Sequence, residues 1–180
     1  MDIFNPDSYC GIYCGACSIA VYGQTGSADS FVTCLGNLPK EELVCSGCKS
    51  DTVYAGCSIC IVRSCARGRN LEHCIECADY PCKNIRICQR GGKILPHTRE
   101  TASSLEAIKR DSVDCWLDAQ KKRWSCPNCG TPFSWYASTC SKCGRSLALR
   151  AYKLSCFKRF LCRFTLTAAY RKAKAKNKSA

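Results

Sequence analysis

The sequence is poor in the aliphatic and aromatic residues from which most protein cores are built. Apolar residues make up 46% of its 180 residues, but this figure includes 20 cysteines, and without them the share is about 35%. So low a share is thin for one continuous core in a chain of this length. It argues against a conventional aliphatic-core enzyme. The composition also excludes a transmembrane protein and a disordered chain.

A secretory signal is also missing from the sequence. Residues 1–7 read MDIFNPD, with no basic segment, and no uninterrupted apolar stretch follows them. We therefore expect a cytoplasmic protein. Cysteine above about 8–10% indicates either a secreted disulfide scaffold or a set of metal sites. Because thiols stay reduced in the cytosol, the sequence predicts a metalloprotein.

Acidic residues are absent from Ala119 onward, where 15 Lys and Arg residues occur. The first 118 residues hold all 14 acidic residues and 12 basic ones, so the net charge of +13 belongs to the last third. The charge therefore indicates binding to nucleic acid or to an anionic membrane only for that third of the chain.

Familiar catalytic patterns are missing as well. There are no paired carboxylates and no nucleophile–base pair, and Gly-Gly-Lys at 91–93 lacks the flanking pattern of a P-loop. Asp111, Asp114 and Asp118 lie on or near one face of an expected helix, where solvent exposure explains them better than catalysis. The sequence favours a binding protein over an enzyme.

The cysteine spacing divides the chain into four segments and predicts a small metal-stabilised α+β fold. Residues 1–92 form an irregular cysteine-rich domain of knuckles, and residues 93–123 a linker helix. Residues 124–147 form a zinc ribbon, and residues 148–180 a basic amphipathic helix with a disordered tail.

Two helices show clear apolar periodicity. The linker helix is expected over 103–123, with a capping box of Ser103 and Glu106 and a basic end at 121–123. Its apolar face holds Leu105, Ile108, Val113, Cys115, Trp116 and Leu117. The second helix is expected over 151–170, and 171–178 should be disordered because nothing there can be buried. The apolar face of the second helix holds Leu154, Phe157, Phe160, Leu161, Phe164 and Ala168, and we expect it to pack on the ribbon.

The most specific motif is a pair of matching knuckles, Cys126-Pro-Asn-Cys129-Gly and Cys140-Ser-Lys-Cys143-Gly. A C-x2-C turn points two sulfurs at one ion, and the glycine after it allows the chain to fold back. The two knuckles predict a closed tetrahedral zinc site, with residues 131–136 as the strand-forming part of a short hairpin. Trp135 and Tyr136 either stack on bases or, more often for such residues, cover the knuckle.

The front domain carries a larger set of thiolate ligands, whose pairing the spacing leaves open. Twelve cysteines would make three four-thiolate sites, and the isolated Cys34 is the one left over. His73 is a bystander beside Cys74. The predicted ligands are Cys10, Cys14, Cys17, Cys45, Cys48, Cys57, Cys60, Cys65, Cys74, Cys77, Cys82 and Cys88.

Zinc and iron–sulfur clusters both suit tetrahedral thiolate sites, so the metal of the front domain stays open. Cys10-x3-Cys14-x2-Cys17 has the spacing of radical S-adenosylmethionine enzymes. The alternating strands and helices of their barrel do not follow it, which excludes that chemistry. A bacterial ferredoxin pattern is not matched either, because Pro81 precedes Cys82 instead of following it.

Four motifs in order resemble a family of small cysteine-rich prokaryotic proteins known only as a domain of unknown function. They are Tyr9-Cys-Gly-Ile-Tyr-Cys-Gly-Ala-Cys17, Cys45-Ser-Gly-Cys48, Cys60-Ile-Val-Arg-Ser-Cys65-Ala and Cys74-Ile-Glu-Cys-Ala-Asp-Tyr-Pro-Cys82. Some members carry a tryptophan-containing helix and a zinc ribbon, as residues 116–143 do here. The resemblance covers about residues 8–147 and implies a cytosolic metal-binding protein of no settled activity. Cys34, Cys88 and the basic extension after residue 148 lie outside the pattern.

The basic last third has three interpretations: a solvated end, a nucleic-acid contact and an anionic-membrane contact. We place nucleic acid just ahead of the membrane. The contact residues would be Lys158, Arg159, Arg163, Arg171, Lys172, Lys174, Lys176 and Lys178.

Three functions remain compatible with the sequence. The first is a zinc-stabilised binding or adaptor module for RNA, DNA or a protein partner. The second is an iron–sulfur redox or electron-transfer protein, and the third is a protein for metal storage or delivery.

Overall fold

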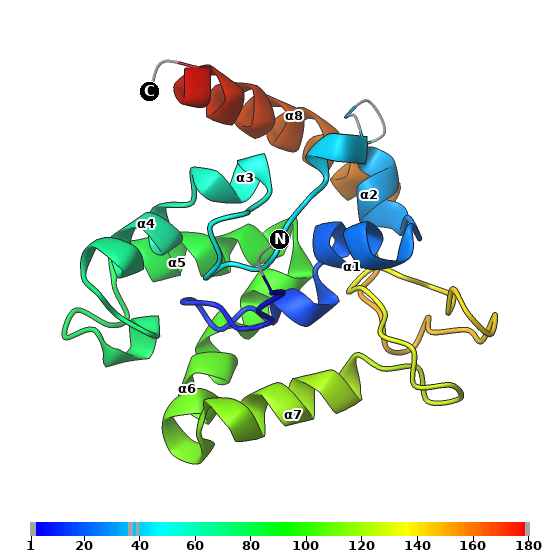
Figure 1. The fold of residues 1–180 in the computed structure, drawn as a ribbon, viewed down its shortest axis with the longest axis horizontal. Coiled ribbons are helices and arrows are strands. Elements are labelled where there is room, and N and C mark those ends of the chain that lie inside the picture. The colour runs from blue at the N-terminus through cyan, green and yellow to red at the C-terminus, as the bar shows by residue number, and fades with distance from the viewer. Residues whose placement is uncertain (1–2, 36–37, 39, 179–180) are drawn as a thin grey trace.

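The computed structural model describes residues 3–35, 38 and 40–178, and its regular elements are helices (Figure 1). In this part of the chain the α-helices are α1 (Ser18–Thr25), α2 (Ser30–Cys34), α3 (Ala55–Ser58), α4 (Ile61–Gly68), α5 (Lys83–Arg90), α6 (Thr101–Asp111), α7 (Val113–Arg123) and α8 (Cys156–Lys178). Short 3-10 helices lie between them: η1 (Cys14–Ala16), η2 (Lys40–Glu42), η3 (Cys74–Glu76), η4 (Gly91–Lys93) and η5 (Pro96–Glu100). Helix α8 crosses one end of the molecule over α2 and α3, and α6 and α7 lie at the opposite end.

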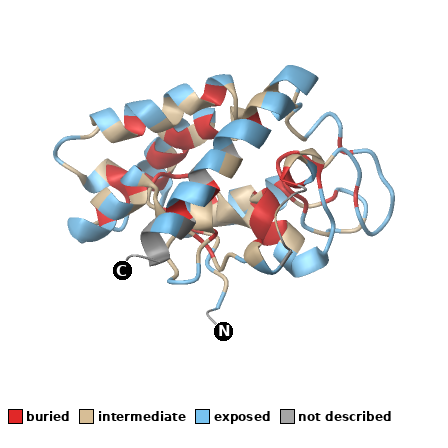
Figure 2. Cartoon of the chain, turned by 90° about the horizontal axis from the view of Figure 1, so that it is seen from above, coloured by how far each residue is buried: buried red, intermediate tan, exposed pale blue. Residues whose placement is uncertain are grey.

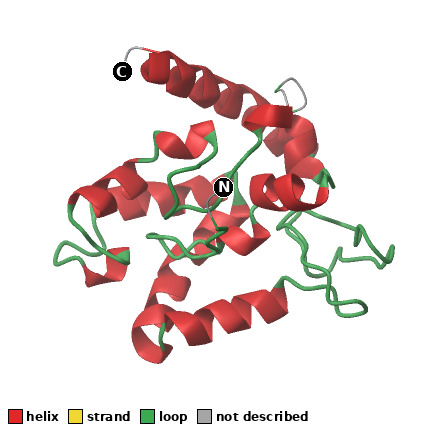
Figure 3. Ribbon diagram, viewed as in Figure 1, coloured by secondary structure: helices red, strands yellow, loops and turns green. Residues whose placement is uncertain are grey.

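The described residues contain no β-strand, which corrects the α+β expectation (Figure 3). Their β-pairing consists of two isolated bridges, Ser125 with Pro132 and Thr139 with Ser146. Each knuckle closes on itself: the N–H of Cys126 donates to the carbonyl of Thr131, and the N–H of Cys140 to that of Arg145, both at 2.9 Å. Because each turn uses its own backbone groups, residues 131–136 form no hairpin strand. The fold is mostly helical.

One apolar core joins the front of the chain to residues 124–147 (Figure 2). The N–H of Trp135 donates to the carbonyl of Ala16 at 3.0 Å, so the backbones of the two regions are also bonded. These regions, which the sequence separates into segments, therefore share an interior. The buried members of this core are Ala16, Ile19, Phe31, Val32, Leu35, Leu43, Tyr54, Trp124, Cys126, Phe133, Trp135, Tyr136, Cys140, Leu147 and Tyr170.

His97 in η5 joins this core through aromatic contacts. Its ring stacks on Trp135 with the centroids 3.8 Å apart, and its Nδ1 lies 2.6 Å from the hydroxyl of Tyr136. Desolvation lowers the pKa of His97 to about 3, so the ring is neutral and shares a hydrogen bond with the Tyr136 hydroxyl through Nδ1. Trp135 and Tyr136 are buried in these contacts and have no free face for stacking on bases.

The linker consists of two helices, whereas the periodicity predicted a single helix over 103–123. Helices α6 and α7 meet at Ser112, whose φ of 101° interrupts the helical backbone. The Ser112 hydroxyl accepts the N–H of Cys115 at 3.3 Å and so caps α7. The interruption changes the phase of the apolar stripe, and Cys115 is exposed although Trp116 is buried.

The predicted capping box is also wrong. Helix α6 begins at Thr101, two residues before Ser103, so Ser103 lies inside the first turn. Its hydroxyl donates to the carbonyl of Glu100 at 3.0 Å instead of receiving a backbone N–H. Serine hydroxyls commonly make this backward bond inside helices, and the sequence pattern alone does not distinguish the two roles.

Helix α8 begins at Cys156 rather than at residue 151 and continues to Lys178, which corrects the expectation of a disordered end. Tyr170 and Ala173 are buried, so packing holds the helix well beyond residue 170. The side chains of Lys174, Lys176 and Lys178 lie outside the described residues. No helix in the described part of the chain combines the length and apolar character needed to cross a membrane.

Of the predicted apolar face, Leu154 packs against the core that includes residues 124–147, but the phenylalanines of α8 point into solvent, so their expected packing on the ribbon is wrong. Phe157, Phe160 and Phe164 are 70%, 59% and 60% exposed. The contacts with α2 and α3 are made on the other side, where Cys162 and Ala173 are buried. Small side chains let helices approach closely, as Cys162 and Ala173 do here. Of the aromatic rings on α8, that of Tyr170 is buried in the core, whereas those of Phe157, Phe160 and Phe164 are exposed.

Asp29 ties α1, α2 and residues 124–147 together. One carboxylate oxygen accepts the N–H groups of Phe31 and Val32, both at 2.8 Å, and so caps α2. The other oxygen accepts the hydroxyls of Ser18 and Ser134, both at 2.5 Å. All of these groups are buried, so each depends on the carboxylate for its partner.

We expect Asp29→Ala to lower the free energy of unfolding by about 2–4 kcal/mol, because it removes a helix cap and leaves two buried hydroxyls unpaired. Asp29→Asn keeps one oxygen for the cap and should cost about 1 kcal/mol. Urea unfolding of the metal-loaded protein measures both values. A loss below about 0.5 kcal/mol for Asp29→Ala would contradict this role.

Candidate metal centre

Four cysteines of the segment 124–147 converge on one point. The sulfurs of Cys126 and Cys143 lie 3.6 Å apart, as do those of Cys129 and Cys140. Thiolates at 2.3 Å from one tetrahedral ion would lie about 3.8 Å apart, so the spacing fits a single metal ion. Among the described residues this is the one group of three or more possible ligands whose ligand atoms all lie within 4.8 Å of one another.

The two knuckles produce this convergence through their backbone. Gly130 and Gly144 follow the second cysteine of each pair with φ of 70° and 72°, a conformation that glycine adopts without strain. The N–H of Gly130 donates to the carbonyl of Cys126 at 2.8 Å, and that of Gly144 to the carbonyl of Cys140 at 3.0 Å. Each turn thereby brings its two sulfurs to the same side.

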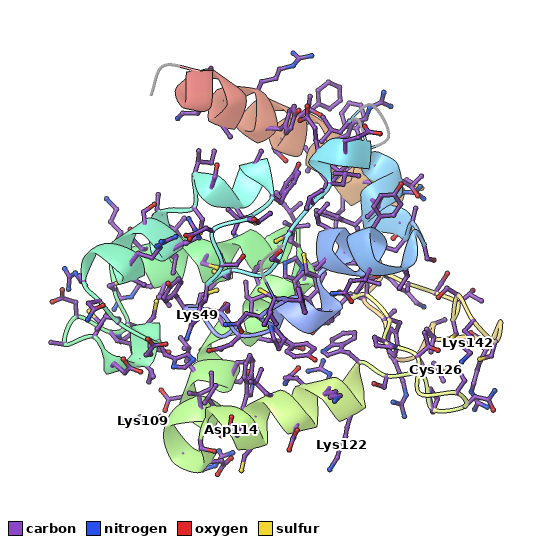
Figure 4. The ribbon with its side chains drawn as sticks, in the orientation of Figure 1. Lys49, Lys109, Asp114, Lys122, Cys126 and Lys142 are labelled. Carbon is purple, nitrogen blue, oxygen red and sulfur yellow. The ribbon has the colours of Figure 1, made fainter. Side chains whose placement is uncertain are left out.

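Hydrogen bonds favour the thiolate form at Cys129 and Cys143. At Cys140 backbone N–H groups act in the same direction, but burial and the neighbouring thiols outweigh them and raise its pKa to about 11. The side chain and backbone of Thr131 lower the pKa of Cys129 to about 6. The backbone N–H of Arg145 lowers the pKa of Cys143. Four thiolates on a divalent ion leave a net charge of −2, and the exposed Lys142 and Arg145 belong to the same turn (Figure 4).

The surroundings of the four sulfurs make the centre structural in type. Cys126 and Cys140 are buried in the shared core, beside Trp124 and Phe133. With four protein ligands, a tetrahedral ion has no position left for water or substrate. The arrangement can bind a metal ion and fix two turns, and it offers no site for hydrolysis.

The front cysteines gather in two neighbouring sets, of which the first surrounds Cys17. Burial, followed by the charge of Cys45, raises the pKa of Cys17 to about 12. Burial also raises the pKa of Cys14, with Cys48, Cys17 and Cys45 acting in the same direction. Cys57 is exposed as a residue, but its thiol is desolvated and its pKa is raised by desolvation and by Cys17 and Cys45. Thiolate charges raise one another's pKa only at short range, so these shifts place the cysteines of the first set near one another.

The second set surrounds Cys74 and includes Cys88, which lies outside the family pattern. The hydrogen bond between Cys10 and Cys88 raises the pKa of Cys10 and lowers that of Cys88. Burial, followed by the charges of Cys10, Cys82 and Cys65, raises the pKa of Cys74 to about 12. The charge of Cys10 acts to raise the pKa of both Cys48 and Cys60, so these two cysteines lie between the two sets.

The remaining cysteines have other surroundings. The Cys34 thiol donates to the carbonyl of Ser30 at 3.0 Å, within α2. The pKa of Cys162 is raised by the burial of Cys162 itself and then by the charge of Cys34. Cys34 therefore faces α8 rather than the front sets. Cys115 and Cys156 are exposed on α7 and α8.

A buried charge network beside the front cysteines was not foreseen from the sequence. Nζ of Lys49, which is labelled in Figure 4, lies 2.7 Å from Asp7 and 2.9 Å from Glu72. Nε2 of His73 lies 3.0 Å from Asp7. Burial acts to raise the pKa of Asp7, but the hydrogen bonds of His73 and Lys49 outweigh it and the pKa is lowered. Nδ1 of His73 lies 3.5 Å from Glu76, so both of its ring nitrogens face carboxylates rather than a metal site. The only signal in the sequence was that Lys49 and His73 each adjoin a cysteine.

The comparisons with known proteins agree with the cysteine motifs. Residues 7–87 match the family model described as a protein of unknown function (DUF3795). No curated protein and no solved structure matches the chain. The matched range contains the front cysteines from Cys10 to Cys82 and ends before Cys88 and the convergent site at 126–143. The resemblance carried by the cysteine motifs is confirmed over residues 7–87, where the chain matches the cysteine-rich family of unknown function DUF3795.

Proposed function

We propose that the protein is a zinc-stabilised binding module. The observation that carries this proposal is the convergence of the four sulfurs of Cys126, Cys129, Cys140 and Cys143. A closed set of four thiolates in tetrahedral spacing suits zinc better than the harder divalent ions, which prefer oxygen ligands. Because no ligand position stays open, the ion would act on the fold and not on a substrate.

The packing around the site supports a role in holding the whole molecule together. Trp124, Phe133 and Trp135 stand in the same core as Ala16 and Phe31 of the front segment. Small metal domains commonly lose their fold without the ion. Loss of the ion would therefore unfold the residues of 124–147 that pack against the apolar side chains of the front segment.

We expect Cys129→Ser to remove one zinc ion per chain and to lower the free energy of unfolding by about 3 kcal/mol or more. Chelation of the wild-type zinc should have the same effect. Zinc analysis and the fluorescence of Trp124 and Trp135 during urea unfolding measure the change. Cys115→Ser, at an exposed cysteine outside the site, is the control and should behave as wild type. An unchanged zinc content in Cys129→Ser would contradict the assignment.

We further propose that the module binds an anionic membrane surface through α8. Phe157, Phe160 and Phe164 recur at a spacing of three and four residues and so form one outward stripe, with the rings of Phe160 and Phe164 4.6 Å apart. The exposed Arg159 and Arg163 flank one side of the stripe. Apolar rings bordered by basic residues are typical of helices that lie in the membrane interface.

The exposed rings favour a lipid surface over nucleic acid as the partner. On a membrane the phenylalanines would enter the acyl boundary while Arg159, Arg163 and Lys172 meet the headgroups. A phosphate backbone would engage only the basic residues and leave the rings in water. No acidic residue follows Asp118, so nothing on α8 repels an anionic surface.

We expect the protein to sediment with phosphatidylcholine vesicles that contain phosphatidylserine and not with pure phosphatidylcholine. The double variant Phe160→Ala/Phe164→Ala should bind the anionic vesicles at least tenfold more weakly, because two buried rings are lost. Leu149→Ala, which removes an exposed apolar side chain outside α8, is the matched control and should bind normally. Salt-sensitive binding to single-stranded RNA that is indifferent to both phenylalanines would instead support the nucleic-acid interpretation.

A further inference from the structure

A cavity of about 110 Å³ opens among three cysteines of the second front set. Cys65 comes from α4, Cys77 from the loop after η3, and Cys82 from the residue before α5. Arg69, Asp79, Lys83 and Asn84 complete the lining. Three thiols from three separate segments thus face one space, although no two of them form a C-x2-C pair.

These sulfurs are arranged differently from those of the segment 124–147. There the paired sulfurs lie 3.6 Å apart, and among the described residues only that group meets the 4.8 Å spacing. One zinc ion draws its thiolates to about 3.8 Å from one another, which leaves no room between them. Thiols spread around a cavity suit a larger inorganic core that carries several metal ions.

Cys74 lies next to the cavity, at the start of the C-x2-C turn that ends at the lining residue Cys77. It is buried in η3, and the N–H of Cys77 donates to its carbonyl at 3.3 Å, which closes the C-x2-C turn. The thiols of Cys82, Cys65 and Cys77 all act on its pKa, after burial and Cys10. Cys74 therefore lies within electrostatic reach of each cysteine that lines the cavity.

Arg69 adds a donor directed at one of these sulfurs. Its Nη1 donates to Sγ of Cys77 at 3.2 Å and to Asp79 at 2.6 Å. Asp79 holds the guanidinium in place beside the thiolate. Hydrogen bonds to ligand sulfurs are among the main features by which proteins set the potential of iron–sulfur clusters.

We propose that Cys65, Cys74, Cys77 and Cys82 hold a [4Fe–4S] cluster in this cavity, with Arg69 as a positioning residue at its Cys77 ligand. The site is separate from the zinc site of residues 126–143 and belongs to the part of the chain matched by the family model. Each of the four thiolates would bind one iron, so no iron of the cluster has an open position. Its chemistry is the gain or loss of one electron.

The test uses the full chain purified without oxygen, with iron, zinc and acid-labile sulfide measured per chain. We expect about four iron and four sulfide, together with visible absorption of an iron–sulfur cluster. Cys77→Ser and Cys82→Ser should each lose most of the iron and the absorption. Cys34→Ser, at a cysteine bonded within α2, is the control and should retain them.

The two metal assignments can fail independently in this experiment. Cys129→Ser should lose zinc and keep the iron chromophore, whereas Cys77→Ser should do the opposite. Circular dichroism of each variant checks that the chain is still folded. A colourless protein after anaerobic reconstitution with ferrous iron and sulfide, with extra zinc that Cys77→Ser removes, would overturn the cluster and leave a mononuclear site.

Arg69 provides a test that does not remove a ligand. One electron from dithionite converts [4Fe–4S]²⁺ to [4Fe–4S]⁺, and the guanidinium stabilises the added negative charge. Arg69→Gln should therefore shift the midpoint potential, followed by electron paramagnetic resonance, to a more negative value at unchanged iron content. Arg67→Gln is the matched control, since Arg67 also ends α4 but pairs with Asp51 at 3.1 Å. Equal potentials in both variants and the wild type would remove Arg69 from the site.

Discussion

The repulsion between closely packed thiolates is the constraint on which this structure depends. Burial and neighbouring thiols raise the pKa of Cys17 and Cys48 to about 12, so without a cation these groups stay protonated at neutral pH. A metal ion reverses this balance because it bonds the thiolate and releases the proton. Since the chain has few aliphatic residues for its length, the proposed metal–sulfur bonds would supply much of the cohesion that apolar packing supplies elsewhere.

The two cysteine arrangements differ in how closely their sulfurs converge, and the proposals of a zinc ion at one and an iron–sulfur cluster at the other rest on this difference. In the segment 124–147 short turns with glycines at 130 and 144 bring sulfurs to 3.6 Å. Around Cys65, Cys77 and Cys82 the ligands arrive from a helix, a loop and a helix start, and a cavity remains between them. The difference lies in the backbone that carries the sulfurs, and not in the sulfurs themselves.

Much of the candidate site was predictable because its signals are local. A C-x2-C-G turn needs only five neighbouring residues, and both knuckles converge as the spacing predicted. The front motifs likewise gave the family. What failed depended on tertiary context. The break at Ser112 requires a backbone conformation that serine rarely adopts, and the inward face of α8 was set by the fit of Cys162 and Ala173 against α2 and α3.

The charge network and the cavity lay beyond the sequence for a related reason. Asp7 and His73 are separated by 66 residues, and Cys65 and Cys82 meet only after α4 and α5 have packed. Spacing along the chain carries no information about such distant partners. The absence of strands in the segment 124–147 was also beyond the sequence. Its backbone groups could have formed hydrogen bonds within each turn or between the two turns, and three-dimensional geometry decides between these.

The core shared by the front segment and residues 124–147 has a consequence for how such chains can be divided. A fragment that ended at residue 92 would expose Ile19, Phe31 and Val32 to water, and its α2 would lose the Ser134 contact at Asp29. Any relative that consisted of the DUF3795 region alone would need another cover for this face, from its own chain or from a second subunit. The boundary of sequence similarity in this protein is therefore not a boundary of independent folding.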